Sequence, residues 1–141
     1  MKLYTVELSR LWLRGRSNHL SYDNKKSVAD ILVVTDVVQL APNPDDDWRS
    51  IGCATFNHAF PDGASVPMII RGLALRLAED QDRRVLVMCN AGRNRAPLFA
   101  AMMWLYMHKN TTGREAITHL RSIRPNALAN PAFVRYLENM P

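Results

Sequence analysis

The sequence predicts an α/β fold in which a central mixed, mainly parallel sheet is flanked by helices. Short runs of β-branched and apolar residues alternate along the chain with longer segments whose apolar residues recur at helical spacing. Alternation of this kind is typical of parallel sheets covered by helices. The 141 residues, 48% of them hydrophobic, are enough for a sizeable core, so we expect residues 1–141 to form a single domain.

The first half of the chain predicts strands separated by polar loops. Residues 3–8 (LYTVEL) alternate in polarity and predict an edge strand. Residues 14–27 are polar and predict a loop, whereas residues 30–40 (DILVVTDVVQL) contain a β-branched run that predicts a buried strand. The proline- and aspartate-rich residues 41–48 predict a surface loop, and residues 51–56 predict a further strand.

The next part of the chain predicts a turn, a helix, a strand and a second helix. Residues 60–65 carry turn chemistry around an Asp-Gly pair. Ser65 is expected to cap a helix that runs to about residue 80, with Pro67 in its first turn. Residues 83–89 (RRVLVMC) predict a short strand, and residues 95–108 predict a helix that is apolar almost all round and therefore buried.

Two further helices are indicated by the residues at their N-termini. Thr112 and Glu115 have the spacing of a capping box, in which each side chain bonds a backbone amide near the helix start. Asn130 followed by Pro131 predicts the start of a last short helix, because asparagine is a favourable cap and proline suits the first helical position.

Charge and cysteine content limit the classes of function. The formal net charge is +5 and 14 of the 18 basic residues are arginines, which favours an anionic ligand beside the alternative of a solvated basic surface. Cys53 and Cys89 are too few for a disulfide framework, and the four histidines lack metal-ligand spacing. We therefore expect reduced thiols, no metal, no cofactor and a cytoplasmic location. No apolar run is long enough to span a membrane.

Cys89 lies where a predicted strand ends and a buried helix begins. Ligands of open α/β sheets bind at this carboxyl edge. The amides and dipole of the helix N-terminus attract an anion and stabilise a thiolate. Ala91 and Gly92 keep side chains out of the bend, and Arg95 can grip two phosphoryl oxygens. We therefore expect Cys89 to stand beside a phosphate-binding loop of Asn90, Ala91, Gly92, Arg93, Asn94 and Arg95.

A thiolate beside a phosphate-binding loop predicts nucleophilic attack on phosphorus, a phosphocysteine intermediate and its hydrolysis by water. Arg95 and the loop amides would stabilise the phosphoryl group during transfer. A general acid must protonate the leaving oxygen, and Asp62 in the 60–65 turn is the candidate. Its competitors are Asp45, Asp46 and Asp47, although an acidic run in a loop is usually solvated. The alternative for Cys89 is a small buried core residue.

Residues 85–97 (VLVMCNAGRNRAP) resemble the signature loop of the cysteine-dependent protein tyrosine phosphatases, in particular their dual-specificity branch. Residues 121–137 are similar to the C-terminal helix pair of that branch. Residues 56–67 are similar to the general-acid loop of the phosphatases of regenerating liver, which also share the Arg-Ala-Pro run after the signature. The likeness covers residues 30–138, implies a tyrosine/dual-specificity phosphatase-like catalytic domain and places the family acid on Asp62.

Two positions depart from the family pattern. Met88 stands where the family has a histidine that helps to ionise the nucleophile, and Ala96 stands where it has a hydroxyl that helps the thiolate leave. Low-molecular-weight tyrosine phosphatases lack that histidine, and the slow phosphatases of regenerating liver carry the alanine. The departures therefore concern the rate of turnover more than the chemistry.

Three functions remain open on these residues. The first is hydrolysis of phosphotyrosine in proteins, with phosphoserine and phosphothreonine as further substrates. The second is hydrolysis of a phosphoinositide or an RNA 5′-phosphate. It is favoured by Arg93, where lipid phosphatases carry Lys or Arg, although a solvated arginine is the alternative. The third is phosphate binding with little turnover, as in a pseudophosphatase.

Several expectations about partners follow. Vanadate, phosphate and sulfate are expected to inhibit, whereas nucleic acid is not an expected partner. Cys53 is expected to be a core residue, with a redox partnership with Cys89 as the alternative.

Overall fold

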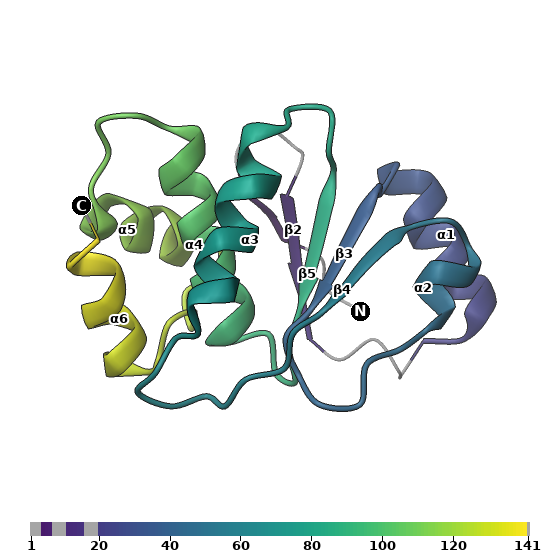
Figure 1. Cartoon of the computed structure of the whole chain (residues 1–141), viewed down its shortest axis with the longest axis horizontal. Helices are drawn as coiled ribbons and strands as arrows, with labels where there is room; N and C mark the ends of the chain where they lie inside the picture. The colour runs from purple at the N-terminus through teal and green to yellow at the C-terminus, as the bar shows by residue number, and fades with distance from the viewer. Residues whose placement is uncertain (1–3, 7–10, 16–19, 141) are drawn as a thin grey trace.

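The computed structural model describes residues 4–6, 11–15 and 20–140, which form a five-stranded sheet with helices on both faces (Figure 1). The sheet has the order β1-β2-β5-β3-β4. Its strands are β1 (Tyr4–Val6), β2 (Leu11–Arg14), β3 (Asp36–Gln39), β4 (Ala54–Asn57) and β5 (Val85–Met88). The helices are α1 (Tyr22–Leu32), α2 (Asp47–Ser50), α3 (Met68–Glu79), α4 (Arg95–Met107), α5 (Gly113–Ile123) and α6 (Pro131–Glu138). Only the β1–β2 pair is antiparallel, which confirms the mainly parallel α/β fold.

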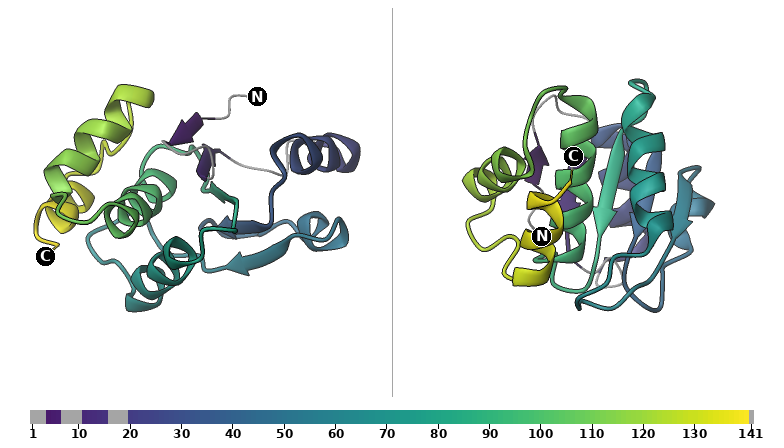
Figure 2. Two further views of the ribbon diagram at one scale, coloured as in Figure 1. Left: turned by 90° about the horizontal axis from the view of Figure 1, so that it is seen from above. Right: turned by 60° about the vertical axis from the view of Figure 1, so that its left-hand side comes forward.

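Alternate residues of the central strands face two separate cores, because side chains in a strand point to opposite faces in turn. Leu11, Val85 and Val87 belong to the larger core, which lies under α3, α4, α5 and α6. Trp12 and Leu86 belong to the smaller core, which lies under α1 and α2. Figure 2 shows these two helix layers on opposite sides of the sheet.

The register of the parallel strands determines where the connecting loops emerge. Met88 of β5 pairs with Arg14 of β2 and with Gln39 of β3, and Gln39 pairs in turn with Asn57 of β4. The four strands therefore end level with one another. The segments that follow them all leave the sheet at the same carboxyl edge, which is the edge where ligands bind in folds of this class.

The last three helices agree with their sequence signals. α4 begins at Arg95 and is buried over most of its length, as its apolar composition predicts. The Thr112 side chain accepts a hydrogen bond from the Glu115 amide at 3.1 Å and caps α5. The Asn130 side chain accepts one from the Ala132 amide at 2.9 Å and caps α6, with Pro131 as its first residue.

The expected loop at residues 14–27 and the expected strand at residues 30–40 are wrong in part, because α1 covers residues 22–32. Ser21 caps this helix by accepting a hydrogen bond from the Asn24 amide at 3.2 Å. Val28 packs into the core under the helix, and Val33 ends it in the left-handed region with φ 53°. The cap and the packing of α1 therefore outweigh the strand propensity of the β-branched run, and the strand is confined to Asp36–Gln39.

Smaller differences concern the turns. The expected cap at Ser65 is wrong: α3 starts at Met68, with Pro67 rather than Ser65 at its N-cap position and no capping side chain. The 41–48 segment is largely a loop as expected, but its end enters α2 and its Trp48 is fully buried. The expected edge strand is confirmed for Tyr4–Val6, whereas the other residues of 3–8 lie outside the described residues.

β2 was not predicted from the sequence, although its Leu11 and Leu13 are fully buried in the larger core. Within the part of the chain that the structure describes, no helix is both long and apolar enough to cross a bilayer.

Two glycines provide a matched test of the packing. A Cβ at Gly113 would overlap the backbone carbonyl of Leu137, whereas a Cβ at Gly72 on α3 would meet nothing within 4 Å. Gly113→Ala should lower the free energy of unfolding by about 1–3 kcal/mol or more, because the backbone of α6 must move. Gly72→Ala should raise it by about 0.5–1 kcal/mol through helix propensity. Urea denaturation of both variants measures the two effects. An equal change in the free energy of unfolding for both variants would contradict the close α5–α6 contact.

Candidate active site

The predicted nucleophile lies at the carboxyl edge of the sheet. Cys89 follows directly on β5 and is 3% exposed. Its sulfur accepts a hydrogen bond from the backbone amide of Ala96 at 3.4 Å. That amide belongs to the first turn of α4, where no earlier carbonyl of the helix can pair with it. The positive end of the helix dipole is therefore directed at the sulfur.

A pocket of about 230 Å³ opens at this thiol. It is lined by Asp62 and by every residue of the loop from Cys89 to Arg95 except Gly92. The structure thus brings together the side chains that sequence analysis assigned to nucleophile, phosphate binding and general acid. The volume is below that of a typical drug-binding pocket and suits a compact group.

Gly92 lies outside the pocket because it forms the back of the loop. Its φ is +64°, and a Cβ there would lie 2.8 Å from the backbone of Arg14 and Gly15 and 2.6 Å from Nη1 of Arg124. Any other residue would be both strained in its backbone and short of space. Gly92 therefore lets the loop lie directly against the end of β2.

Two carbonyls of the loop are held on its outer side. Nη2 of Arg124 donates to the Ala91 carbonyl at 2.9 Å, and the Leu128 amide donates to the Arg93 carbonyl at 2.7 Å. Neither Arg124 nor Leu128 lines the pocket. These two carbonyls are therefore engaged outside the pocket, which favours an anion inside it because a carbonyl oxygen would repel negative charge.

Arg95 is the first residue of α4 and lines the pocket. It is 8% exposed, and its Nη1 donates to the carbonyls of Phe60 at 2.8 Å and Leu40 at 3.3 Å. These bonds orient the guanidinium through one nitrogen only. Its Nε and Nη2 have no partner among the described residues and can donate to an oxyanion.

Asp62 faces the same pocket from the turn before α3. One carboxylate oxygen accepts a hydrogen bond from Nδ2 of Asn94 at 2.7 Å, and the other accepts one from Nδ2 of Asn130 at 2.6 Å. Sequence analysis assigned Asn94 to phosphate binding and Asn130 to helix capping, and it missed the contact of both with Asp62. A helix cap already accounted for Asn130, so no unexplained signal pointed to a second contact.

The competing aspartates are engaged elsewhere. Nζ of the buried Lys25 pairs with carboxylates of Asp45 and Asp47, at 2.9 Å from Asp47. Burial opposes the charge of Lys25, but the two hydrogen bonds raise its pKa above the ordinary value. Asp46 is exposed at the start of α2. None of these three aspartates lines the pocket beside Cys89.

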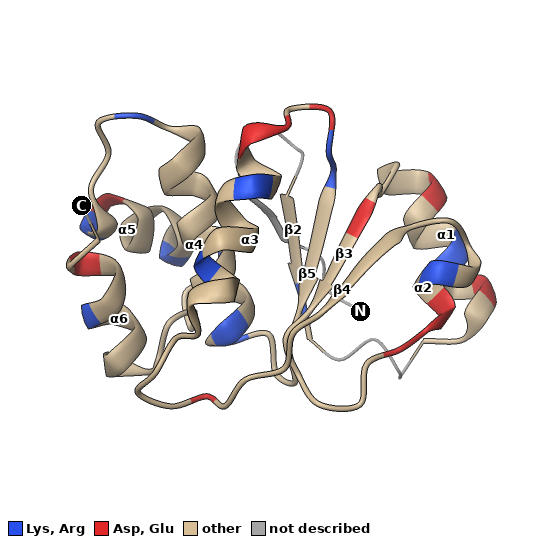
Figure 3. Ribbon diagram, in the orientation of Figure 1, with Lys and Arg blue, Asp and Glu red and all other residues tan. Residues whose placement is uncertain are grey.

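Arg93 is exposed, in agreement with the solvated alternative, yet it also borders the pocket. A neighbouring hollow of about 520 Å³ is lined by Arg93, Arg121 and Asn126 among others. Basic residues are distributed over α3, α5 and α6 (Figure 3). Arg93 at the pocket and Arg121 in the neighbouring hollow bring positive charge to this side of the site.

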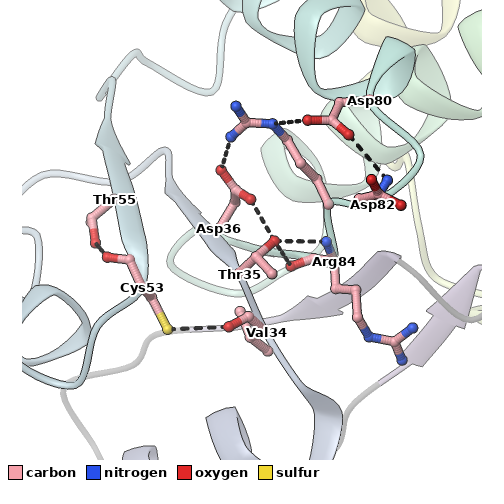
Figure 4. Close-up of polar contacts among 9 residues, drawn as sticks. Val34, Thr35, Asp36, Cys53, Thr55, Asp80, Asp82 and Arg84 are labelled. Atoms are coloured by element: carbon pink, nitrogen blue, oxygen red, sulfur yellow. Dashed lines mark hydrogen bonds and ion pairs between the residues drawn. The ribbon is translucent and has the colours of Figure 1, made fainter.

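Cys53 is a core residue, as expected, and lies at the opposite edge of the sheet. It is 5% exposed beside Val34, to whose carbonyl its sulfur donates at 3.6 Å (Figure 4). Burial raises the pKa of its thiol, and nearby carboxylates add to the effect. Cys53 directly precedes β4 and Cys89 directly follows β5, so the register places the two residues roughly 16 Å apart along the strand direction. A disulfide requires Cα atoms within about 7 Å of each other.

The model of the dual specificity phosphatase catalytic domain matches residues 11–140. Cyclin-dependent kinase inhibitor 3 of Rattus norvegicus is 32% identical over 88 residues, which cover 59% of this chain and 41% of that relative. The chain thus matches less than half the length of this relative.

Two solved structures share the fold at low sequence identity. The active form of Tk-PTP superposes with a TM-score of 0.79 at 20% identity, over 99% of this chain and 97% of that chain. PTPMT1 in complex with PI(5)P superposes with a TM-score of 0.78 at 19% identity, over 97% and 93% of the two chains. The family match over residues 11–140 confirms the resemblance of the signature loop: the chain belongs to the dual specificity phosphatases, a branch of the cysteine-dependent tyrosine phosphatases.

Proposed function

We propose that this chain acts as a catalytic domain that hydrolyses phosphomonoesters through a phosphocysteine intermediate, with phosphotyrosine in proteins as its leading substrate class. Phosphoserine and phosphothreonine are further substrates of the same chemistry. The observation that carries the proposal is the 230 Å³ pocket in which Cys89, Arg95 and Asp62 converge. Those three side chains supply a nucleophile, a phosphate-binding cation and a proton donor in one place.

In the first step, the thiolate of Cys89 attacks phosphorus and an S–P bond forms while the bond to the leaving oxygen breaks. The proton of Asp62 passes to that oxygen, so the leaving group departs as a neutral alcohol or phenol. Arg95 and the loop amides bind the three remaining phosphoryl oxygens, on which negative charge is spread.

In the second step, the carboxylate of Asp62 takes a proton from a water molecule whose oxygen attacks phosphorus. The S–P bond breaks, phosphate is released and Cys89 returns to the thiolate. The Ala96 amide, at 3.4 Å from the sulfur, supports this leaving group. Ala96 offers no hydroxyl as a second donor, and a single weak donor to sulfur makes this step the slower one.

A second substrate class, phosphoinositides, is supported by the rim of the pocket. Arg93 borders both the pocket and the 520 Å³ hollow that also includes Arg121, so a second phosphate on one ligand could meet positive charge there. The PTPMT1 structure contains PI(5)P, which makes this class worth testing beside phosphotyrosine.

Replacing the nucleophile tests the central proposal. Cys89→Ser should abolish hydrolysis of p-nitrophenyl phosphate, because a neutral serine hydroxyl is a much weaker nucleophile than a thiolate, while circular dichroism stays unchanged. Cys53→Ser, which removes the distant buried thiol, should keep its activity. Turnover that survives in Cys89→Ser would overturn the covalent mechanism, and an inactive wild-type protein that still binds vanadate would instead indicate a pseudophosphatase.

Pre-steady-state kinetics test the slow second step. Rapid mixing with an aryl phosphate should give a burst of phenol close to one equivalent of enzyme, followed by a slow steady rate. Ala96→Ser should raise the steady rate and reduce the burst, because its hydroxyl can donate to the departing sulfur. A linear time course that Ala96→Ser leaves unchanged would mean that the Ala96 amide alone suffices.

Substrate selectivity tests the role of Arg93. Arg93→Ala should lower kcat/KM for a water-soluble phosphoinositide with two phosphates by about fivefold, the effect of an exposed ion pair of about 1 kcal/mol, and should hardly change it for a phosphotyrosine peptide without acidic neighbours. Arg76→Ala on α3 removes the same charge away from the pocket and should change neither value. Equal losses on both substrates would argue against the phosphoinositide class.

A further inference from the structure

The carboxylate of Asp62 is bound between two asparagine side chains that come from different parts of the chain. Asn94 belongs to the phosphate-binding loop and donates from Nδ2 to one oxygen at 2.7 Å. Asn130 stands at the start of α6 and donates from Nδ2 to the other oxygen at 2.6 Å. Asp62 itself lies in an exposed turn with no regular secondary structure. Without these two bonds, nothing in such a turn would hold its side chain in one rotamer.

Further hydrogen bonds determine which way each amide group faces. The backbone amide of Asn130 donates to Oδ1 of Asn94 at 2.8 Å, and Oδ1 of Asn130 accepts from the Ala132 amide at 2.9 Å. Both Oδ1 atoms therefore have N–H donors, and both Nδ2 atoms must face Asp62. The reverse orientation would set an amide oxygen against a carboxylate. We call this arrangement of Asn94, Asn130 and Asp62 the amide clamp.

The turn is also fastened on both sides of Asp62. Before it, the carbonyl of Phe60 accepts a hydrogen bond from Arg95 at 2.8 Å. After it, the carbonyl of Gly63 accepts one from Nδ2 of Asn130 at 3.1 Å. Asn130 thus holds both the backbone of the turn and the carboxylate, and the phosphate-binding Arg95 holds the other end.

We propose that Asn130 is a positioning residue for the general acid: through the amide clamp it holds Asp62 at the pocket that also contains the thiol before substrate arrives. This inference rests on the proposed function, since it concerns the proton that Asp62 delivers. The two Nδ2 donors each use one lone pair of a carboxyl oxygen, so the other lone pair of that oxygen can still carry the proton. When the proton passes to the leaving oxygen, the clamp stabilises the carboxylate that forms.

The capping role of Asn130 and its role in the clamp use different atoms, which makes them separable. Oδ1 caps α6, whereas Nδ2 contacts Asp62 and Gly63. Serine is also a favourable N-cap residue but is too short to reach Asp62. Asn130→Ser should therefore keep the helix and lose the clamp. A change at Asn94 would be less informative, because Asn94 also lines the phosphate pocket.

The test compares leaving groups. For an alkyl phosphate, whose leaving oxygen needs a proton, Asn130→Ser should lower kcat/KM, which reports formation of the phosphocysteine, by about tenfold to a hundredfold, a part of what a general acid contributes. For an aryl phosphate with a strongly acidic phenol, the loss should be several times smaller. The control is Thr112→Ala, which removes the cap of α5 and should affect both substrates equally. An equal loss on both substrates in Asn130→Ser would mean that Asn130 supports the structure but does not position the general acid.

A double-mutant cycle with Asp62→Asn separates this inference from the proposed function. If Asn130 acts through Asp62, Asn130→Ser should cause little further loss once Asp62 is already asparagine. A full, additive loss in that background would overturn the clamp even if Asp62→Asn alone impairs the alkyl substrate selectively. If Asp62→Asn affects all leaving groups equally, Asp62 is not the general acid and the proposed role of Asn130 is wrong as well. The role of Cys89 is tested separately by Cys89→Ser.

Discussion

The loop between β5 and α4 depends on one close approach of two backbones. At Gly92 the chain turns with φ +64° while it lies against the end of β2, and no side chain fits between them. β2 is the neighbour of β5 on the side away from β3, so the loop that follows β5 is supported by the same sheet that carries Cys89. Arg124 and the Leu128 amide hold its carbonyls from the C-terminal segment. The geometry of the pocket follows from these contacts.

The contacts around the pocket connect parts of the chain that are remote in sequence. Arg95 links the loop to the carbonyls of Leu40 and Phe60, which follow β3 and β4. Asn130 links the turn of Asp62 to the start of α6. Each of the proposed catalytic side chains is therefore oriented by groups from at least one other element. A preorganised site of this kind spends little free energy on rearrangement during the reaction.

Much of the fold and the core of the site could be predicted because their signals are local. The apolar helix of α4, the caps at Thr112 and Asn130, and the Cys89–Arg95 spacing are each read from a few neighbouring residues. α1 was mistaken for a loop and a strand because its burial depends on packing under the sheet rather than on β propensity. The clamp could not be predicted, since Asn130 and Asp62 are 68 positions apart and only the folded chain brings them together.

The distance between the two cysteines has a consequence for oxidative chemistry. A thiolate that meets peroxide is converted to a sulfenic acid, and a neighbouring thiol can rescue it as a disulfide before further oxidation. Cys53 is the only other cysteine in the 141 residues, and it lies at the far edge of the sheet beside Val34. Within residues 1–141, Cys89 therefore has no resolving thiol within reach. Recovery of an oxidised Cys89 by thiol exchange would rely on a reductant small enough to enter a 230 Å³ pocket.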